Sequence, residues 1–203
     1  MVTDIVLSSN NMGKAREFGE MLSPMGIVLH LQKEFKIPDA DETGKSFVEN
    51  ALIKARHASA IAKMPALADD SGLCVDALGG APGINSARFC GEHGNDKANN
   101  DKLLELMKDV PVEQRNARFY AALAFVMNAD DPVPIVVGAA WEGSIGLKPM
   151  GQNGFGYDPL FVVTGRNGCT AAQIPPQIKH AISHRARAVA LLLAEMRRNH
   201  YIK

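Results

Sequence analysis

Short apolar runs alternate along this chain with segments whose apolar residues recur at helical spacing, and this alternation is the feature that most constrains the fold. Three short runs are typical of buried strands: Ile5-Val6-Leu7, 27–31 and 160–163. Four longer segments have the periodicity and the capping residues of helices: 12–22, 46–63, 96–108 and 183–198. Strands and helices that alternate in this way predict an α/β fold.

A long hairpin is expected in the middle of the chain. Residues 118–127 and 133–141 flank Asp130-Asp131-Pro132, which has the composition of a turn. The 203 residues are enough to bury a substantial core, and they contain no repeat, low-complexity tract or linker. We therefore expect one domain over residues 1–203, with a mixed sheet and a hairpin arm.

Charge and cysteine content exclude several classes of protein. Lys plus Arg and Asp plus Glu both number 22, so the chain lacks the positive field that nucleic-acid polymers require. The three cysteines share no CxxC spacing, which argues against a disulfide framework or a structural zinc. The N-terminus has no leader-like segment, and no window approaches the about 18 apolar residues of a membrane span. We expect a soluble, unprocessed cytoplasmic protein that binds neither nucleic-acid polymers nor membranes.

Two adjacent carboxylates, Asp69 and Asp70, follow the apolar run Pro65-Ala66-Leu67-Ala68. Two neighbouring acids are unfavourable unless a positive group neutralises them. Hard divalent cations bind oxygen ligands, so a metal site is one interpretation. The alternative is a turn in which one Asp accepts backbone N–H bonds and the other is solvated. In either case we expect the strand to end here, with Ser71-Gly72 forming a turn through which the backbone approaches a ligand.

The polar loop from Ser9 to Lys14 precedes a predicted helix and collects hydroxyl, amide and ammonium groups. Anions bind favourably at helix N-termini, so phosphate is the expected ligand. The segment lacks the spacing of a Walker P-loop, which excludes ATPase or GTPase chemistry of that type. Lys54, on the helix that Ser46 and Glu49 open with capping-box spacing, offers a second cation or a solvated side chain.

A second polar cluster runs from Lys179 to Arg185. Ser183 is a suitable N-cap for the last helix, and His184 and Arg185 then lie in its first turn. Cations are unfavourable there, so these two side chains either face a ligand or lie on the surface. Phe155, in a glycine-rich segment, is either a stacking platform for a nucleotide base or a core residue.

Taken together, these pieces resemble one family, the Ham1-like inosine and xanthosine triphosphate pyrophosphatases. The motifs that carry the resemblance occur in the order of the family and span nearly the whole chain. They are Ser9 to Glu17, Glu42-Thr43-Gly44, Phe47-Val48-Glu49-Asn50-Ala51, Ala68-Asp69-Asp70-Ser71-Gly72, Gly79-Gly80-Ala81-Pro82-Gly83, Gly154-Phe155-Gly156-Tyr157-Asp158-Pro159, and Lys179 through Ser183-His184-Arg185.

The resemblance implies an elongated, two-lobed mixed α/β fold with a central cleft, and a homodimer. It implies that Asp70 is the catalytic base, with Lys14 and Lys54 stabilising the departing pyrophosphate, and that Asp70 and Glu42, or Asp41 in place of Glu42, bind Mg²⁺. The substrate-binding residues that it implies are Ser9, Asn10, Asn11, Met12, Gly13 and Lys14 for the triphosphate, Ser71, and, for the base, Phe155, Gly156, Tyr157, Asp158, Lys179, His184 and Arg185. One departure is Ile174-Pro175-Pro176-Gln177-Ile178, where relatives have an acidic, helix-compatible approach to the lysine.

The resemblance implies hydrolysis of ITP, dITP and XTP to the nucleoside monophosphate and pyrophosphate, which removes deaminated purines from the nucleotide pool. Two alternatives remain open from the residues alone. One is a pyrophosphatase for other modified nucleotides, and its substrate profile would distinguish it. The other is a nucleotide-binding sensor without hydrolysis, for which the aspartate pair would be merely structural.

Overall fold

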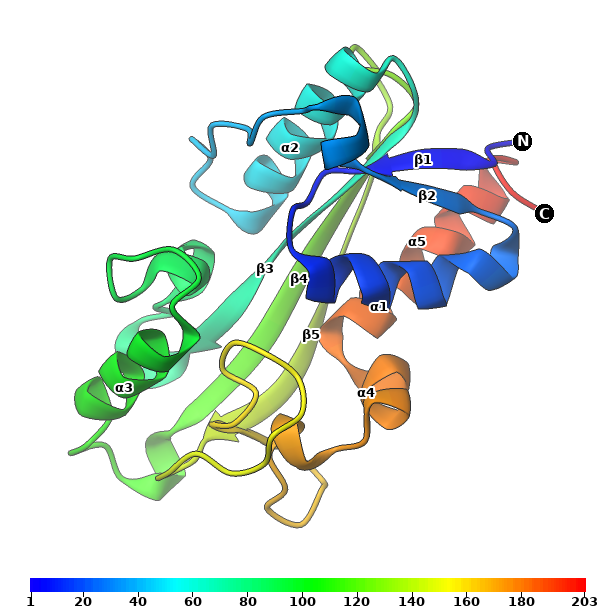
Figure 1. Ribbon diagram of the computed structural model, residues 1–203. Helices are drawn as coiled ribbons and strands as arrows, with labels where there is room; N and C mark the ends of the chain where they lie inside the picture. The colour runs from blue at the N-terminus through cyan, green and yellow to red at the C-terminus, as the bar shows by residue number, and fades with distance from the viewer. The chain divides into compact units, whose positions relative to one another are not determined.

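The computed structural model describes residues 1–203 and has a mixed α/β architecture around a six-stranded sheet (Figure 1). The strand order is β2-β1-β3-β4-β5-β6. The strands are β1 (Asp4–Leu7), β2 (Val28–Leu31), β3 (Ala66–Val75), β4 (Asn116–Val126), β5 (Ile135–Ile145) and β6 (Phe161–Val163). The five helices are α1 (Met12–Leu22), α2 (Phe47–Ala62), α3 (Asp96–Leu106), α4 (Pro176–Ile182) and α5 (His184–Arg198). The predicted fold class is confirmed.

Both parallel and antiparallel pairs occur in the sheet. β1 is parallel to β2, with Ile5 opposite Leu29, and it is also parallel to β3. β5 and β6 are antiparallel. The predicted long hairpin corresponds to β4 and β5, which are neighbours in the sheet.

The chain divides into two compact units, each with its own apolar core. The first unit comprises Met1–Asp70, Ala121–Ala139 and Arg185–Lys203, and the second comprises Ser71–Tyr120 and Ala140–His184. In the first, Ile5 and Leu7 of β1 pack with Phe18 of α1 and Val189 of α5. In the second, side chains of α3, β4, β5 and β6 form the core, including Leu103, Phe119, Trp141 and Phe161. The expectation of one domain over the whole chain stays a prediction, as does that of a central cleft.

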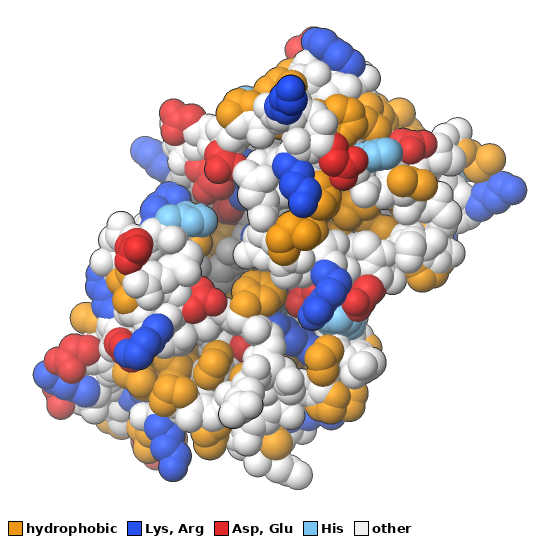
Figure 2. All heavy atoms as spheres, viewed as in Figure 1, with side chains coloured by type: hydrophobic (Ala, Val, Ile, Leu, Met, Phe, Trp, Pro, Cys, Tyr) orange, Lys and Arg blue, Asp and Glu red, His pale blue; other side chains and the backbone are white.

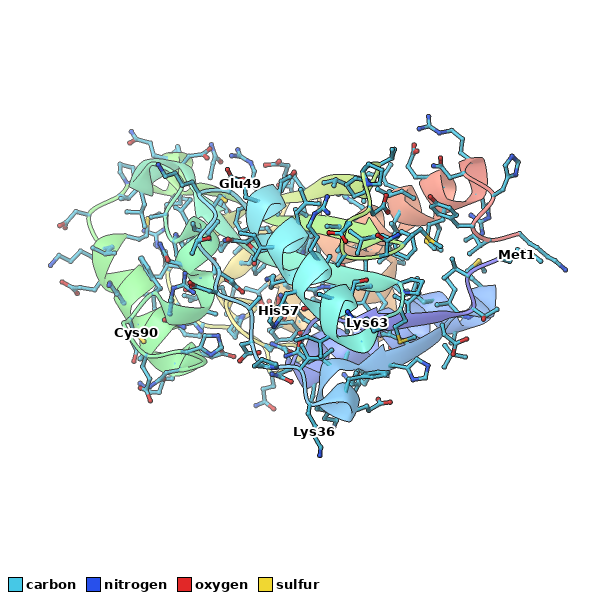
Figure 3. All side chains as sticks on the ribbon, turned by 90° about the horizontal axis from the view of Figure 1, so that it is seen from above. Met1, Lys36, Glu49, His57, Lys63 and Cys90 are labelled. Atoms are coloured by element: carbon cyan, nitrogen blue, oxygen red, sulfur yellow. The ribbon has the colours of Figure 1, made fainter.

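Helix α2 begins and ends where its sequence predicts. Ser46 Oγ accepts a hydrogen bond from Glu49 N at 3.2 Å, and the Glu49 carboxylate accepts one from Ser46 Oγ at 2.9 Å. Lys63, in the left-handed conformation, closes the helix. Figure 3 shows Glu49 and Lys63 at opposite ends of α2, with His57 between them. These caps define where the helix that carries Lys54 begins and ends.

The expected end of a strand at the two aspartates is wrong. β3 continues from Ala66 to Val75 straight through Asp69, Asp70, Ser71 and Gly72, so Ser71-Gly72 is not a turn. Successive side chains of a strand point to opposite faces of the sheet. Asp69 and Asp70 therefore lie on opposite faces of the sheet and have different surroundings. A turn at this point would not require this separation.

The departure before Lys179 does not prevent a helix there. Pro176 stands in the first turn of α4, where its missing N–H and fixed φ are tolerated. The Ser183 N–H donates to Lys179 O at the end of α4, and α5 follows directly. No helix combines the length and the apolar character needed to cross a bilayer. Figure 2 shows cationic and anionic side chains interspersed over the face in view, in keeping with equal totals of 22.

Candidate active site

The first unit contains a group of buried charges centred on the two aspartates of β3. Lys14 Nζ lies 2.8 Å from Asp69 Oδ2, and Lys54 Nζ lies 2.6 Å from Asp70 Oδ1. Lys54 also contacts Glu42 Oε1 at 3.2 Å. Because β3 alternates its faces, each aspartate has a lysine of its own, Lys14 from α1 and Lys54 from α2. The structure thus brings Lys14, Lys54, Asp70 and Glu42 together, as the sequence motifs predict.

The two carboxylates are perturbed in opposite directions. Burial raises the pKa of Asp70 above its ordinary value, and the nearby Lys54 opposes this shift without cancelling it. Burial also disfavours the charged form of Asp69, but Lys14 and Arg185 outweigh it and hold the pKa of Asp69 well below its usual range. Asp70 is therefore the carboxylate that takes up a proton more readily, which suits a general base.

The lysines respond to the same surroundings. Burial lowers the pKa of Lys14, although Asp69 favours its charged form. Burial acts on Lys54 in the same direction, but Asp70 and Glu42 together raise the pKa of Lys54. The Lys14 side chain keeps 17% of its exposure, whereas its partner Asp69 has none. A ligand that enters from solvent can therefore still contact the Lys14 ammonium group.

Arg185 completes this charged group. Its guanidinium contacts the Glu17 carboxylate and lies 3.3 Å from Asp69 Oδ2. Both Glu17 and Arg185 are buried. Sequence analysis missed the part played by Glu17 and Asp69 in this group. The spacing of three residues between Lys14 and Glu17, which puts them on one face of α1, is the signal that could have found Glu17.

The predicted phosphate loop is organised by its own side chains. Asn11 caps α1, since its Oδ1 accepts a hydrogen bond from Lys14 N at 3.0 Å, and Ser9 Oγ accepts one from Asn11 N at 3.1 Å. Asn10 Nδ2 donates to Asp39 Oδ1 at 2.8 Å. Met12 and Gly13 form the first turn of the helix. The loop therefore lies at a helix N-terminus, where anions are stabilised.

The acidic loop from Asp39 to Glu42 is only partly assembled as a metal site. No group of three or more His, Cys, Asp or Glu side chains is arranged to hold a metal ion. Asp41 is exposed. Glu42 and Asp70, however, already share one cation, the Lys54 ammonium, and the buried Asp70 Oδ2 has no hydrogen-bond partner. Two carboxylates that share a cation, one with a spare oxygen, fit a hard divalent metal.

Asn50 anchors the acidic loop to α2. Its Oδ1 accepts a hydrogen bond from Gly44 N at 2.9 Å. A Cβ on Gly44 would lie 2.6 Å from that oxygen, so only glycine permits this approach. His57, on the same helix, contacts Pro38 O at 2.9 Å. Both contacts hold the segment before α2 against the helix that carries Lys54.

The second unit contains the other predicted site residues. Asp158 Oδ2 accepts a hydrogen bond from Phe155 N at 2.9 Å and pairs with Lys179 Nζ at 2.5 Å. Lys179 Nζ also lies 5.0 Å from the centre of the Phe155 ring, a cation–π distance. Tyr157 Oη donates to Ser86 O at 2.8 Å. Phe155, Asp158 and Lys179 therefore form one connected group in this unit, and Tyr157 is anchored separately to Ser86.

His184 lies in an aromatic environment. Its ring stacks on Phe119, with 4.9 Å between centroids and 14° between planes, and more distantly on Trp141, at 6.4 Å and 20°. His184 is buried. The motifs did not reveal either aromatic partner, because both lie on hairpin strands remote in sequence. Ser71 lies in β3 and is half-buried.

Comparison with known proteins gives concordant matches over nearly the whole chain. A sequence model of the Ham1 family matches residues 5–195. The chain is 50% identical over 193 residues to the dITP/XTP pyrophosphatase of Escherichia coli K12, covering 95% of this chain and 98% of that protein. It is 52% identical over 188 residues to the dITP/XTP pyrophosphatase of Vibrio cholerae, covering 93% and 94%. A solved HAM1 protein from Coxiella burnetii superimposes with a TM-score of 0.89 at 44% identity, covering 97% of this chain and all of that one.

Proposed function

This chain belongs to the Ham1 family, and we propose that it hydrolyses the deaminated purine nucleotides ITP, dITP and XTP to the monophosphate and pyrophosphate. The observation that carries this proposal is the buried charge group of the first unit. This group contains Asp70, a carboxylate that has one oxygen without a hydrogen-bond partner. It also contains Lys14 and Lys54, whose ammonium groups are suited to binding phosphate. Relatives of about 50% identity are named dITP/XTP pyrophosphatases, and cleavage of a phosphoanhydride is assisted by a base and by cations of this kind.

The triphosphate is bound by the loop from Ser9 to Gly13 together with Lys14. Backbone and side-chain donors at the start of α1 meet phosphate oxygens, and the helix dipole favours their charge. Lys14 and Lys54 stabilise the negative charge that accumulates on the departing pyrophosphate. Asp69, Glu17 and Arg185 hold Lys14 in place through the ion pairs around it.

Asp70 orients the attacking water and accepts its proton as the water approaches the α-phosphorus. Its raised pKa, caused by burial, moves it toward the range in which a carboxylate serves as a base. A covalent route is disfavoured, because no cysteine lies in a motif and Ser71, which has no histidine neighbour in sequence, is proposed to contact the substrate.

A divalent metal fits the same centre, and Mg²⁺ is the ion we propose. Asp70 and Glu42 would hold it, because they already share a cation and Asp70 has a spare oxygen. Asp41, in the same loop, is a further proposed ligand. When bound, the ion supplies positive charge that stabilises the phosphate oxygens.

Base recognition is assigned to the group in the second unit and to the residues that follow it. The ring of Phe155 stacks on the purine, and Gly156, Tyr157 and Asp158 shape its surroundings. Lys179, His184 and Arg185 provide donors for the 6-keto oxygen of hypoxanthine or xanthine. Adenine presents an amino group at this position, and a buried donor left without an acceptor disfavours it strongly. We also propose that the protein is a cytoplasmic homodimer.

Product analysis tests this function. The protein is incubated with ITP and Mg²⁺, and the phosphorus-containing products are identified by ³¹P NMR. Inosine monophosphate and pyrophosphate are expected in equal amounts. Inosine diphosphate with orthophosphate would contradict the proposed bond cleavage. Tight nucleotide binding without any product would favour the sensor, and turnover of modified pyrimidine triphosphates alone would favour the other alternative.

A further inference from the structure

Gly156, the residue after the proposed stacking ring, is held by two side chains of α3. Its N–H donates to Asp96 Oδ2 at 2.7 Å, and its carbonyl oxygen accepts a hydrogen bond from Asn100 Nδ2 at 2.9 Å. Gly156 has a φ of +61°, in the left-handed region. Helix α3 thus holds both polar backbone groups of one glycine, which lies 56 residues after Asn100 in the sequence.

These two hydrogen bonds bear on the direction of the Phe155 ring. The N–H of Gly156 belongs to the peptide that joins it to Phe155, so Asp96 fixes the orientation of that peptide. Glycine moves between backbone conformations more freely than any other residue. Loss of the two contacts would therefore free this peptide and weaken one restraint on the direction of the Phe155 side chain.

The neighbours of Gly156 are anchored separately. Phe155 N donates to Asp158 Oδ2 at 2.9 Å, and Tyr157 Oη donates to Ser86 O at 2.8 Å. The glycine is therefore a flexible link between anchored residues, and Asp96 and Asn100 are the side chains that hold this link.

Neither residue is the N-cap of α3, although the charge of Asp96 also suits its place in the first turn of that helix. Asn95 already caps α3, since its Oδ1 accepts a hydrogen bond from Ala98 N at 3.0 Å. Asn100 stands inside the helix, where asparagine is a poor helix former, and its buried Oδ1 has no hydrogen-bond partner. Its Nδ2 donates to Asp96 O at 2.9 Å within the helix as well as to Gly156 O at 2.9 Å, and the second of these contacts is the one that joins α3 to the glycine.

We propose that Asp96 and Asn100 are positioning residues for purine recognition, which act by holding Gly156 and so presenting the Phe155 ring to the base. This inference rests on the proposed function, since it assumes that Phe155 stacks on a purine. The proposed function assigns neither residue to the triphosphate or to the reacting atoms. Their loss therefore weakens the binding of ground state and transition state alike.

Two measurements on the same variants test the proposal. The variants are Asp96→Ala and Asn100→Ala, with Asp96→Asn as the conservative variant that keeps the acceptor. Asp101→Ala is the matched control, because Asp101 is an exposed carboxylate on α3 that pairs only locally with Lys97 at 2.6 Å. Hydrogen exchange of residues 154–158 in the nucleotide-free protein reports on the contact, and steady-state kinetics with ITP report on its role.

In the two alanine variants, amide exchange in this segment should accelerate by at least about fivefold, as local opening becomes easier. KM for ITP should rise about 3- to 10-fold while kcat stays within about twofold, the pattern of lost uniform binding. Asp96→Asn and Asp101→Ala should match the unmodified protein in both measurements. In the double variant, KM for ITP should rise by less than the product of the two single-variant increases, because both side chains hold the same glycine.

Unchanged exchange in both alanine variants would overturn the positioning role, and so would faster exchange with an unchanged KM. A fall in kcat at constant KM would also overturn it, because a positioning role in binding does not predict that pattern. An unmodified protein that releases no pyrophosphate from ITP would overturn the proposed function, and the role in base recognition with it. The exchange data, which need no nucleotide, would separate that failure from failure of the contact itself.

Discussion

The two neighbouring aspartates illustrate how single residues acquire different tasks from their surroundings. Asp69 faces Lys14 and Arg185, whose positive charges outweigh the effect of burial and lower the pKa of Asp69. Asp70 faces Lys54 and Glu42, and burial raises its pKa. The alternation of side chains along β3 separates the two environments. Asp69 is consequently held in ion pairs, whereas Asp70 keeps one buried oxygen without a hydrogen-bond partner.

Replacing Asp70 should separate binding from turnover. Asp70→Asn keeps the shape of the side chain but removes the base, so kcat for ITP should fall about 100-fold or more. Nucleotide affinity, measured by calorimetry, should change much less. Asp101→Asn, on the exposed face of α3, serves as the control. Near-normal turnover in Asp70→Asn would place the base elsewhere.

Lys14→Ala should weaken substrate binding and catalysis together. Its charge acts on the triphosphate in the ground state and in the transition state, so KM rises and kcat falls. Steady-state kinetics with ITP measure both parameters. An unchanged KM together with an unchanged kcat would exclude Lys14 from the phosphate site.

Asp69→Asn should destabilise the fold in a pH-dependent way. The change leaves Lys14 and Arg185 without their shared anion, which costs about 3 kcal/mol of unfolding free energy at pH 7. Because the pKa of Asp69 is lowered on folding, its stabilisation is present in full above its unfolded value of about 4. It is lost as the pH falls below that value. Urea titrations at several pH values measure the free energy of unfolding of both proteins. The difference between the variant and the unmodified protein should become smaller toward acid pH. A difference that grows there would contradict the lowered pKa of Asp69.

Among the elements, α2 links the local signals of the sequence to the site. Its capping box, Ser46 with Glu49, could be read from spacing alone and is confirmed. The contact of Lys54 with Asp70, 16 residues away, could not be read in this way. Hydrogen bonds within a helix end can be predicted from residues that are close in sequence. Ion pairs between different elements depend on how those elements pack.

Loss of the cap should destabilise α2 measurably. Ser46→Ala removes an acceptor for the Glu49 N–H, which should lower the free energy of unfolding by about 1 kcal/mol. Ser46→Asp supplies another acceptor and should restore most of this loss. Urea denaturation measures both variants. Equal stability of the alanine variant and the unmodified protein would show that water replaces the cap.

At the scale of the whole molecule, the order of the strands, of the hairpin and of four of the five helices followed from apolar periodicity and turn residues, whereas α4 was not predicted. The path of β3 did not follow in this way, because Ser71-Gly72 looks like a turn in isolation while the sheet continues through it. The predicted lysines and Asp70 come together as expected. Phe119 and Trp141 were not predicted, because they become neighbours of His184 only through the packing of distant segments. The contact of Glu17 with Arg185 depends on packing in the same way, although the spacing from Lys14 already places Glu17 on the same face of α1.

The comparison of ITP with ATP tests the central claim, base-selective hydrolysis by this fold, most directly. Pyrophosphate release is measured for both nucleotides with Mg²⁺ present and absent, and kcat/KM is determined for each. With Mg²⁺, ITP should exceed ATP by at least about 100-fold, as expected where the adenine amino group meets a buried donor. Activity should be lost without the ion. Equal kcat/KM values for the two nucleotides would contradict the account.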